Sequence, residues 1–509
     1  MPRADGSSGA LRLGTCLAAL ACLLLAAAPA VRASELSDDL TARRARMMER
    51  LGPESMLILL SAPPRVYSGD VDYEYRQDSN LYYLTGITQE DTALVLMPGN
   101  ASHREFLFVK DRDAALEHWR GRSLTHEEAS ERSGVATVLS TRDFQPFLAA
   151  MLSRRTWANL VDEADASAFF AALGQGRARL ALAVERAGPA DLPAPPQRLL
   201  RDLRDRHVGF VPIDATPLLT DLRIVKTPYE LRMLETATAI SIEAQIAGMH
   251  AAEPGVFEYQ VKAAIEAVHR ARGAVSPAYP SIVGSGPNAT ILHYPQGARQ
   301  LEAGDLLLVD AAANFAYQAS DLTRTYPVNG TFTAPQRDIY ALVLRAQEAA
   351  IDAAKPGATL ATIHARTVDV LKQGLVELGL ITDTSGEQYR MWFTHSTSHF
   401  IGIDVHDVGD RNTALQPGMT FTIEPGLYIR QEALDALPRT AANLALIEKV
   451  QPAVSKYLGI GVRIEDDFVV DASGVRNLSA ELPRGVDEIE AAMRQRGGAE
   501  GNTRASGGR

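Results

Sequence analysis

The sequence predicts an α/β protein with two domains: an N-terminal α/β domain over residues 37–222 and an internally duplicated domain over residues 226–485. The first domain is predicted from short apolar runs that alternate with amphipathic stretches, and the second from a helix–Pro-Gly–helix pattern that occurs twice. A chain of 509 residues is long enough for two or three domains. Its apolar content of 46% and charged content of 22% are ordinary for a globular protein.

The first 33 residues have the pattern of a secretory signal peptide. Arginines supply positive charge, the run 17–28 is apolar, and small-residue cleavage sites end at Ala30 and Ala33. A helix made by this 12-residue run would reach about 18 Å, which is too short for a hydrocarbon core of about 30 Å. We therefore expect export to the periplasm or the cell exterior, with no membrane association after cleavage at either site.

Both cysteines, Cys16 and Cys22, lie in this segment, so the mature chain would contain no disulfide and no thiol chemistry. An uncleaved anchor and a lipid on Cys22 are the alternatives. Removing the segment changes the formal net charge from −11 to −13, because it holds three Arg and one Asp. An acidic chain without a basic cluster does not suit nucleic acid, and we expect no such partner. The Gly-rich tail 496–509 is predicted to be disordered.

Four short apolar runs predict strands in the N-terminal domain: 56–60, 93–97, 106–109 and 180–184. Helical patterns lie between several of them. In the second domain, a capping box at 227–230 with proline at the first helical position begins a helix, which ends at Glu-Pro-Gly 253–255, and a second helix ends at Gly273. The same three signals recur about a hundred residues later, at 333–336, 355–357 and Gly379. Each pair of helices precedes strand-like sequence, which predicts a duplicated domain with a site between its halves.

Two aspartates follow the first strand-like sequence of the second domain. Asp310 ends the apolar run 306–309, and Asp321 lies beyond the turn-like segment 314–317. Burying a carboxylate next to an apolar strand is costly unless the carboxylate is paired or binds a cation. Two strands joined by a short turn could bring both carboxylates to one point. For this pair alone, solvated strand ends are the alternative.

Two further acids and a histidine complete the pattern. Glu424 and Glu465 follow later apolar runs, and His399 lies in a segment that begins at His395 and reaches His406. This segment is not the helical zinc motif, because no Glu follows its first histidine. Four carboxylates and one imidazole suit a pair of hard or borderline divalent ions. We expect two manganese ions, with zinc or cobalt as alternatives.

The second domain resembles the pita-bread metallopeptidases, and among them it is most similar to aminopeptidase P. The matching segments occur in the family's order: 291–294, 309–312, 320–327, 399–406, and 424–426 with 463–466. The likeness continues into the N-terminal domain through residues 75–80 and 83–86, so it covers nearly all of the mature chain. The resemblance implies a creatinase/aminopeptidase P-like N-terminal α/β domain followed by a pita-bread catalytic domain.

The resemblance also implies a role for each acid. Asp310 and Asp321 would bind one ion, and Asp321 and Glu465 would bridge to the second, whose ligands His399 and Glu424 complete. A water between the ions would be the nucleophile. Glu424 would act as the catalytic base and pass a proton to the leaving proline nitrogen.

Three histidines and an arginine match positions that line the family's substrate site: His293, His395, His406 and Arg463. One of the histidines would steady the oxyanion, and we count His293 and His406 among the catalytic residues. For Arg463, a structural salt bridge is the alternative. The expected activity is that of an exported aminopeptidase that releases the N-terminal residue from peptides with proline in second position. We expect a homo-oligomer, either a dimer or a tetramer.

Three alternatives share part of this pattern. Prolidase has the same ligands but cleaves only Xaa-Pro dipeptides, whereas methionine aminopeptidase lacks such an N-terminal domain. A metal-free binding module is disfavoured because all five ligands are retained. One departure from the family pattern is an insertion over residues 429–458, which is of helical composition. It could cover the site or join subunits, and it leaves the peptide-length preference open.

Overall fold

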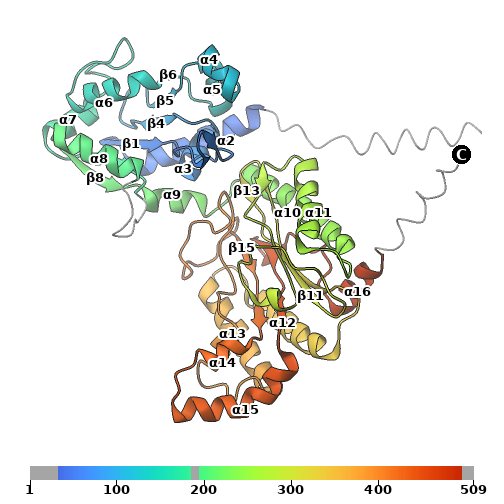
Figure 1. Ribbon diagram of the computed structural model, residues 1–509. Coiled ribbons are helices and arrows are strands. Elements are labelled where there is room, and N and C mark those ends of the chain that lie inside the picture. The colour runs from blue at the N-terminus through green and yellow to red at the C-terminus, as the bar shows by residue number, and fades with distance from the viewer. Residues whose placement is uncertain (1–32, 185–193, 496–509) are drawn as a thin grey trace, which may run out of the picture.

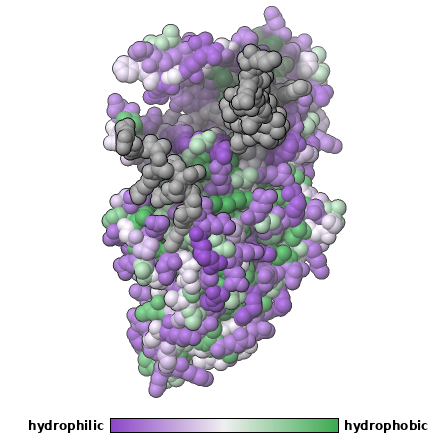
Figure 2. Space-filling model, turned by 90° about the vertical axis from the view of Figure 1, so that its right-hand side faces the viewer, coloured by the Kyte–Doolittle hydropathy of each residue, from purple (hydrophilic) through white to green (hydrophobic). Residues whose placement is uncertain are grey.

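Residues 33–184 and 194–495 are described by the computed structural model, and they form two α/β domains that meet near residues 223–228 (Figure 1). Apart from Ala33, the predicted signal peptide lies outside these ranges, as do both cysteines and the predicted disordered tail. Within the described ranges, no helix is both long and apolar enough to cross a membrane. The face of the molecule in Figure 2 is mainly hydrophilic, with apolar residues scattered over it.

The N-terminal domain is built on a six-stranded sheet with the order β6-β5-β4-β1-β7-β8. Only β4 runs antiparallel to its neighbours. The strands are β1 (Ser55–Leu60), β4 (Ala93–Leu96), β5 (Glu105–Val109), β6 (Val138–Ser140), β7 (Ala178–Leu182) and β8 (Phe210–Asp214). Three predicted strands are confirmed to within one residue at each end. The fourth was placed two residues too late, because β7 takes its register from the parallel pairs with β1 and β8.

Helices cover both faces of this sheet. On one face, Met56 and Ile58 pack with α6 (Phe144–Leu152), α7 (Ser167–Gly174) and α8 (Pro195–Arg206). On the other face, Leu57 and Leu59 pack with α2 (Ala33–Leu51), α3 (Ser79–Thr85), α5 (His126–Ser133) and α9 (Thr216–Arg223). A strand covered on both faces must be apolar at successive positions, which explains the unbroken apolar runs in the sequence. The remaining elements are β2 (Val66–Ser68), β3 (Val71–Asp72), α4 (Ala114–Arg120) and the 3-10 turn η1 (Thr141–Asp143).

The second domain consists of two halves that each begin with a pair of helices, as predicted. The first half contains α10 (Pro228–Ala251), α11 (Glu258–Ala271), β9 (Ser276–Pro277), β10 (Ile282–Ser285), η2 (Gly286–Thr290), β11 (Leu306–Asp310), β12 (Ala313–Phe315), β13 (Gln318–Ala319) and β14 (Thr323–Pro327). The second half contains α12 (Ala334–Ala353), α13 (Leu360–Glu377), η3 (Gln388–Met391), β15 (Thr420–Ile423), β16 (Gly426–Tyr428), α14 (Gln431–Asp435), α15 (Ala441–Tyr457), β17 (Gly461–Arg463), β18 (Asp466–Val470), β19 (Val475–Asn477) and α16 (Val486–Gln495). One apolar core joins the two halves.

The predicted helix starts follow from local hydrogen bonds. At α10, Thr227 Oγ1 accepts the backbone N–H of Glu230 at 3.2 Å, and Glu230 Oε2 accepts that of Thr227 at 3.0 Å. Both partners of the capping box are therefore present. At α12, Gln336 Oε1 accepts the backbone N–H of Thr333 at 2.9 Å. The strands of the halves meet through a bridge between Thr323 and Glu465, which places the halves' strand ends side by side.

The β12–β13 hairpin inserts its tip into the N-terminal domain. Its two turn residues, Ala316 and Tyr317, both have positive φ, 48° and 63°, as a two-residue hairpin turn of this kind requires. The Tyr317 ring stacks on Tyr82 with ring centroids 3.8 Å apart, and the guanidinium of Arg76 lies 5.1 Å from its centre. The backbone N–H of Gln77 donates to the Tyr317 hydroxyl at 3.2 Å. Tyr317 is 5% exposed and belongs to the apolar core of the N-terminal domain.

A buried ion network fastens the connection between the domains. Asp407 accepts hydrogen bonds from Arg223 at 2.5 Å and from Lys226 at 2.7 Å. Arg223 also contacts Asp404 at 2.8 Å and Asn80 at 2.8 Å. A buried pair is costly to break, because the remaining charge then lacks a partner in a poorly solvated place. The network therefore fixes the loop that contains Asp404 and Asp407 against the end of α9.

We expect Tyr317→Ala to lower the free energy of unfolding by about 3 kcal/mol, because it removes a buried aromatic ring from the interface between the domains. Tyr317→Phe keeps the stacked ring and loses only the hydroxyl bond, so we expect a loss of about 1 kcal/mol. Calorimetry of both variants would measure the two changes. Equal melting temperatures for Tyr317→Ala and the unchanged protein would contradict a supporting role for the hairpin tip.

Candidate metal centre

The two halves of the second domain bring the predicted acids to one place. Asp310 is the last residue of β11 and pairs with Thr323 at the start of β14. The β12–β13 hairpin returns the chain between these strands, so Asp321 lies next to Asp310, as the sequence predicted. Glu465 comes from the other half through its bridge with Thr323, and Glu424 directly follows β15.

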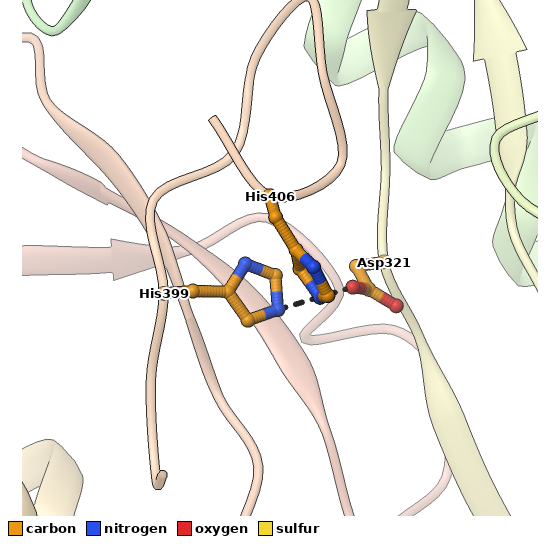
Figure 3. Close-up of side chains that lie close together, drawn as sticks. All are labelled: Asp321, His399 and His406. Atoms are coloured by element: carbon orange, nitrogen blue, oxygen red, sulfur yellow. Dashed lines mark ion pairs between the residues drawn. The ribbon is translucent and has the colours of Figure 1, made fainter. Parts of the chain in front are cut away.

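His399 lies among these carboxylates. Its Nε2 atom is 3.3 Å from Asp321 Oδ2, 3.4 Å from Glu424 Oε1 and 3.9 Å from Glu465 Oε1. Figure 3 shows the His399 ring directed at Asp321, with the His406 ring beside it. The Nδ1 atom lies 3.1 Å from the backbone oxygen of Phe400. A carbonyl oxygen can only accept, so Nδ1 carries the proton and Nε2 is the atom free to bind a metal.

The four acids and His399 form two sets of candidate metal ligands. One set is Asp310, Asp321 and Glu465, the other is His399, Glu424 and Glu465, and the ligand atoms of each set lie within 4.8 Å of one another. Two sets that share one carboxylate suit two neighbouring ions better than one. A third combination joins His406 to Asp321 and His399, although His406 itself is exposed.

The pKa shifts of the acids and of His399 indicate that this cluster contains too few positive groups to balance its carboxylates. Burial raises the pKa of Glu424 to about 7 and the pKa of Glu465 well above its usual value, and neighbouring carboxylates add to both shifts. Burial by itself would lower the pKa of His399, but its contacts with Asp321 and Glu424 outweigh this and raise the pKa to about 9. These shifts mean that the cluster attracts positive charge. Carboxylate oxygens and one imidazole are donors that manganese, zinc and cobalt accept, so the residues fit divalent ions.

Residues that the sequence analysis missed hold the ligands in place. Tyr279 donates its hydroxyl proton to Asp310 Oδ1 at 2.5 Å, and Thr323 donates to Glu465 Oε2 at 2.6 Å. Neither type of side chain stands out in a sequence as a metal-site residue. Bonds of this kind fix the orientation of a ligand, because they leave it fewer rotamers.

Asp467 holds the backbone of Asp321 in place by hydrogen bonds. It accepts the backbone N–H of Asp321 at 3.1 Å and the hydroxyl protons of Ser320 at 2.7 Å and Thr238 at 2.9 Å. The neighbouring Asp466 instead pairs with the buried Arg324 at 2.6 Å. Three successive acids thus have separate roles: Glu465 faces the site, and the other two hold strands together.

Arg463 lies beside the ligands and is buried. Its guanidinium donates to Asp310 at 2.5 Å, to Thr323 Oγ1 at 3.1 Å and to the Tyr428 hydroxyl at 2.8 Å. The Tyr428 hydroxyl in turn lies 2.8 Å from His395 Nε2. These bonds occupy Arg463 within the protein, which agrees with the structural salt bridge that the sequence left as an alternative. Arg463 also contributes to the pocket lining.

The three histidines predicted for the substrate site line the same pocket as the ligands. His395 Nδ1 is 2.8 Å from the backbone oxygen of Ser396, and burial lowers the pKa of His395 to about 3. Partial desolvation, with the neighbouring His399, lowers the pKa of His406, and both His406 and His293 are exposed on the pocket wall. His395 is therefore neutral near pH 7 and able to accept a hydrogen bond from Tyr428. The pocket has a volume of about 350 Å³ and includes Leu292, Ser396 and Ser398, to which the sequence had assigned no role at the site.

Comparisons with known proteins agree with the fold and show the family. Residues 232–472 match the model of metallopeptidase family M24, and residues 40–161 match the N-terminal domain of aminopeptidase P. A Xaa-Pro aminopeptidase of Haemophilus influenzae is 34% identical over 466 residues, which cover 90% of this chain and 97% of that protein.

Solved structures give the same result. Aminopeptidase PepP of Pseudomonas aeruginosa is 33% identical with a TM-score of 0.74, and aminopeptidase P from Escherichia coli with the inhibitor Pro-Leu is 32% identical with a TM-score of 0.75. Each alignment covers 91% of this chain and 99% of the solved chain. The predicted order of an aminopeptidase P-like N-terminal domain and a pita-bread domain is thereby confirmed.

We expect Asp321→Ala to lower bound metal and to reduce peptide hydrolysis at least 100-fold, because Asp321 contributes to both the aspartate pair and the histidine contact. The fold should survive, because the substitution removes one of several like charges that repel one another. Elemental analysis and thermal unfolding would measure both effects. Asp369→Ala, which alters an exposed acid of the same domain, is the control. Undiminished activity of Asp321→Ala would contradict the proposed site.

The metal-free protein should lose stability between about pH 7.5 and pH 9. The pKa values of Asp467 and His399 are raised to about 8 and about 9, so both groups bind more protons in the folded chain than in the unfolded chain within this window. Stability therefore falls as the pH rises, by at most about 1.4 kcal/mol per pH unit for each group. Histidines with a lowered pKa act in the opposite direction only near or below 6.5, their ordinary value.

Thermal unfolding with a chelator and with added manganese would measure this difference. Metal binding requires the deprotonated ligands, so the loaded protein should lose less stability over the same window. A melting temperature of the metal-free protein that rises from pH 7.5 to pH 9 would contradict the charge balance described for the site.

Proposed function

The chain belongs to metallopeptidase family M24 and is a metallo-aminopeptidase, and from this premise we propose that it hydrolyses the bond between the N-terminal residue of a peptide and a proline in second position. One observation carries the proposal: the five predicted ligands converge in a single pocket. The chain also matches a named Xaa-Pro aminopeptidase over 90% of its length, with the N-terminal domain included.

We propose that two divalent ions, manganese in the first place, are held by Asp310, Asp321, His399, Glu424 and Glu465. When bound, such ions supply Lewis acidity, which polarises a carbonyl group and lowers the pKa of water. The chain's own residues would then transfer protons and orient the substrate. Glu424 lies at the pocket surface, 3.5 Å from His395 Nδ1, where it can hold the proton taken from water. Hydrolysis delivers that proton to the proline nitrogen as the carbon–nitrogen bond breaks.

Proline in second position explains why a pocket of this kind is needed. The bond before proline is a tertiary amide whose nitrogen has no hydrogen, so enzymes that grip the substrate backbone lose a donor there. In this site, the histidines His293, His395 and His406 line the same pocket as the candidate metal ligands, so substrate contacts there do not require a backbone N–H donor. They would shape the space for the proline ring and stabilise the oxyanion.

The acidic character of the pocket favours a free N-terminus. Four carboxylic acids, Asp310, Asp321, Glu424 and Glu465, face only two basic groups, Arg463 and His399, and the raised pKa values of the two glutamates show that the site favours added positive charge, from a protonated α-amine as well as from metal ions. The Escherichia coli structure holds Pro-Leu, a dipeptide that begins with proline as the product of the proposed reaction would. We therefore assign the N-terminal residue to the side of the pocket nearest the acids.

We also propose export and self-association. Export is supported by the sequence of residues 1–33 and by the acidic mature chain without cysteine. Self-association into a dimer or a tetramer is supported by exposed apolar residues on the N-terminal domain, among them Tyr67, Tyr73 and Trp119, which is 84% exposed. N-terminal sequencing of the protein from a periplasmic or culture fraction should begin at Val31 or Ser34. A cytoplasmic protein that retains residues 1–33 would refute export.

The substrate preference can be tested with three peptides that differ at one point: one with proline second, one with alanine second, and one with an acetylated N-terminus. We expect the two changes each to reduce kcat/KM at least 100-fold, about 3 kcal/mol of transition-state stabilisation. A Xaa-Pro dipeptide belongs in the same series. Activity confined to the dipeptide would identify a prolidase instead, and equal rates on the alanine peptide would refute proline specificity.

A further inference from the structure

Two hollows continue from the metal pocket across the second domain. The first has a volume of about 430 Å³ and shares Leu292 and His293 with the metal pocket. The second has a volume of about 490 Å³ and shares Met391, Thr394 and Arg430 with the first. Shared lining residues place the first hollow next to the metal pocket and the second hollow next to the first. We name the two hollows together the distal groove.

The insertion 429–458 forms one wall of the distal groove. Ala433 of α14 and Leu446 of α15 line the second hollow, together with Leu437 between the two helices. No residue of 429–458 lines the metal pocket itself, in the part of the chain that the structure describes. Helix α15 is anchored to the rest of the domain, because Val450 and Val454 are buried in its core. The insertion thus lengthens the site and leaves the metal pocket uncovered.

The distal groove contains one positive charge without a counter-ion. Arg390 is paired with Glu387, so these two lining residues balance each other. Arg430 is exposed and lines both hollows, and its guanidinium forms no ion pair with any residue in the described ranges. The site is therefore acidic at the metal pocket and basic at Arg430. A peptide has the complementary polarity, with its ammonium group at the N-terminus and a carboxylate at its C-terminal end.

We infer that the distal groove binds the residues that follow proline in longer peptide substrates, and that Arg430 pairs with a carboxylate of those residues. This inference rests on the proposed function, which places the N-terminus of the substrate at the metal pocket. The carboxylate can be the C-terminus of a short peptide or an acidic side chain of a longer one. The apolar groups of Met391, Leu437 and Leu446 would contact the intervening side chains.

The test compares peptides that begin Xaa-Pro and differ only in the distal carboxylate: free acid against amide at the C-terminus, and Glu against Gln as a side chain. Arg430→Gln should reduce kcat/KM about three- to fivefold for the carboxylate peptides, mainly through KM, as expected for an exposed ion pair. It should leave the amidated, Gln-containing peptide unchanged. The loss should shrink at high salt. The free-acid and Glu arms show which carboxylate is bound.

Two further variants sharpen the result. Arg439→Gln removes an exposed positive charge of the same insertion that does not line the groove, so its kinetics should stay unchanged. Arg430→Glu should reverse the preference, favouring peptides with Lys over peptides with Glu. Equal losses on carboxylate and neutral peptides, or no loss on any carboxylate peptide, would overturn the inference.

A binding measurement separates this inference from the proposed function. Calorimetry with peptides that begin with proline, as free acids and as amides, needs no turnover. Carboxylate-dependent binding that Arg430→Gln weakens would support the groove even if the enzyme failed to cleave Xaa-Pro peptides. Binding without any dependence on the carboxylate would refute the groove, whatever the hydrolysis rates.

Discussion

One electrostatic constraint governs the centre of the second domain: three buried carboxylates, Asp310, Asp321 and Glu465, and the partly buried Glu424 surround a single histidine. Without compensation such a cluster is repulsive, and the raised pKa of Glu424 records that repulsion together with the effect of burial. Arg463 compensates part of it through Asp310, and the donor set suits divalent ions for the rest. The hydrogen bonds that Tyr279 and Thr323 donate, and the one that Asp467 accepts from the backbone of Asp321, have a common effect: they hold charged groups together that would otherwise move apart.

The sequence allowed the acids to be singled out because Asp310, Glu424 and Glu465 follow apolar runs, and the structure brings them together with Asp321. Asp310 and Asp321 are joined by a hairpin short enough to recognise locally, whereas Glu424 and Glu465 come together through the pairing of β15 with β18 across the insertion. The supporting residues have no such signal. Tyr428, which also contacts His395, reaches Arg463 through the pairing of β16 with β17, a contact between segments separated by the whole insertion. Its role therefore depends on register between distant segments, which local pattern does not specify.

The remaining differences from expectation have similar causes. The strand predicted at 180–184 begins earlier because parallel neighbours on both sides determine its register. The helical composition of the insertion was recognisable, but the surface on which its helices pack was not. That surface decides whether the segment closes the metal pocket or extends it. The role of Arg463 was also open, because the sequence does not show whether its partners are substrate atoms or the protein groups Asp310, Thr323 and Tyr428.

The hairpin tip at Tyr317 has an evolutionary consequence. The aspartates Asp310 and Asp321 lie on either side of this hairpin, whereas the socket that holds Tyr317 consists of Arg76, Gln77 and Tyr82 in the other domain. Recombination between the two domains would separate the hairpin tip from the residues that bind it, and each would then face an unrelated domain. We therefore expect the two domains to be inherited as one unit. Loops and helices of the catalytic domain that lie away from the hairpin can lengthen freely. Exchange of the N-terminal domain would require new residues that bind the hairpin tip.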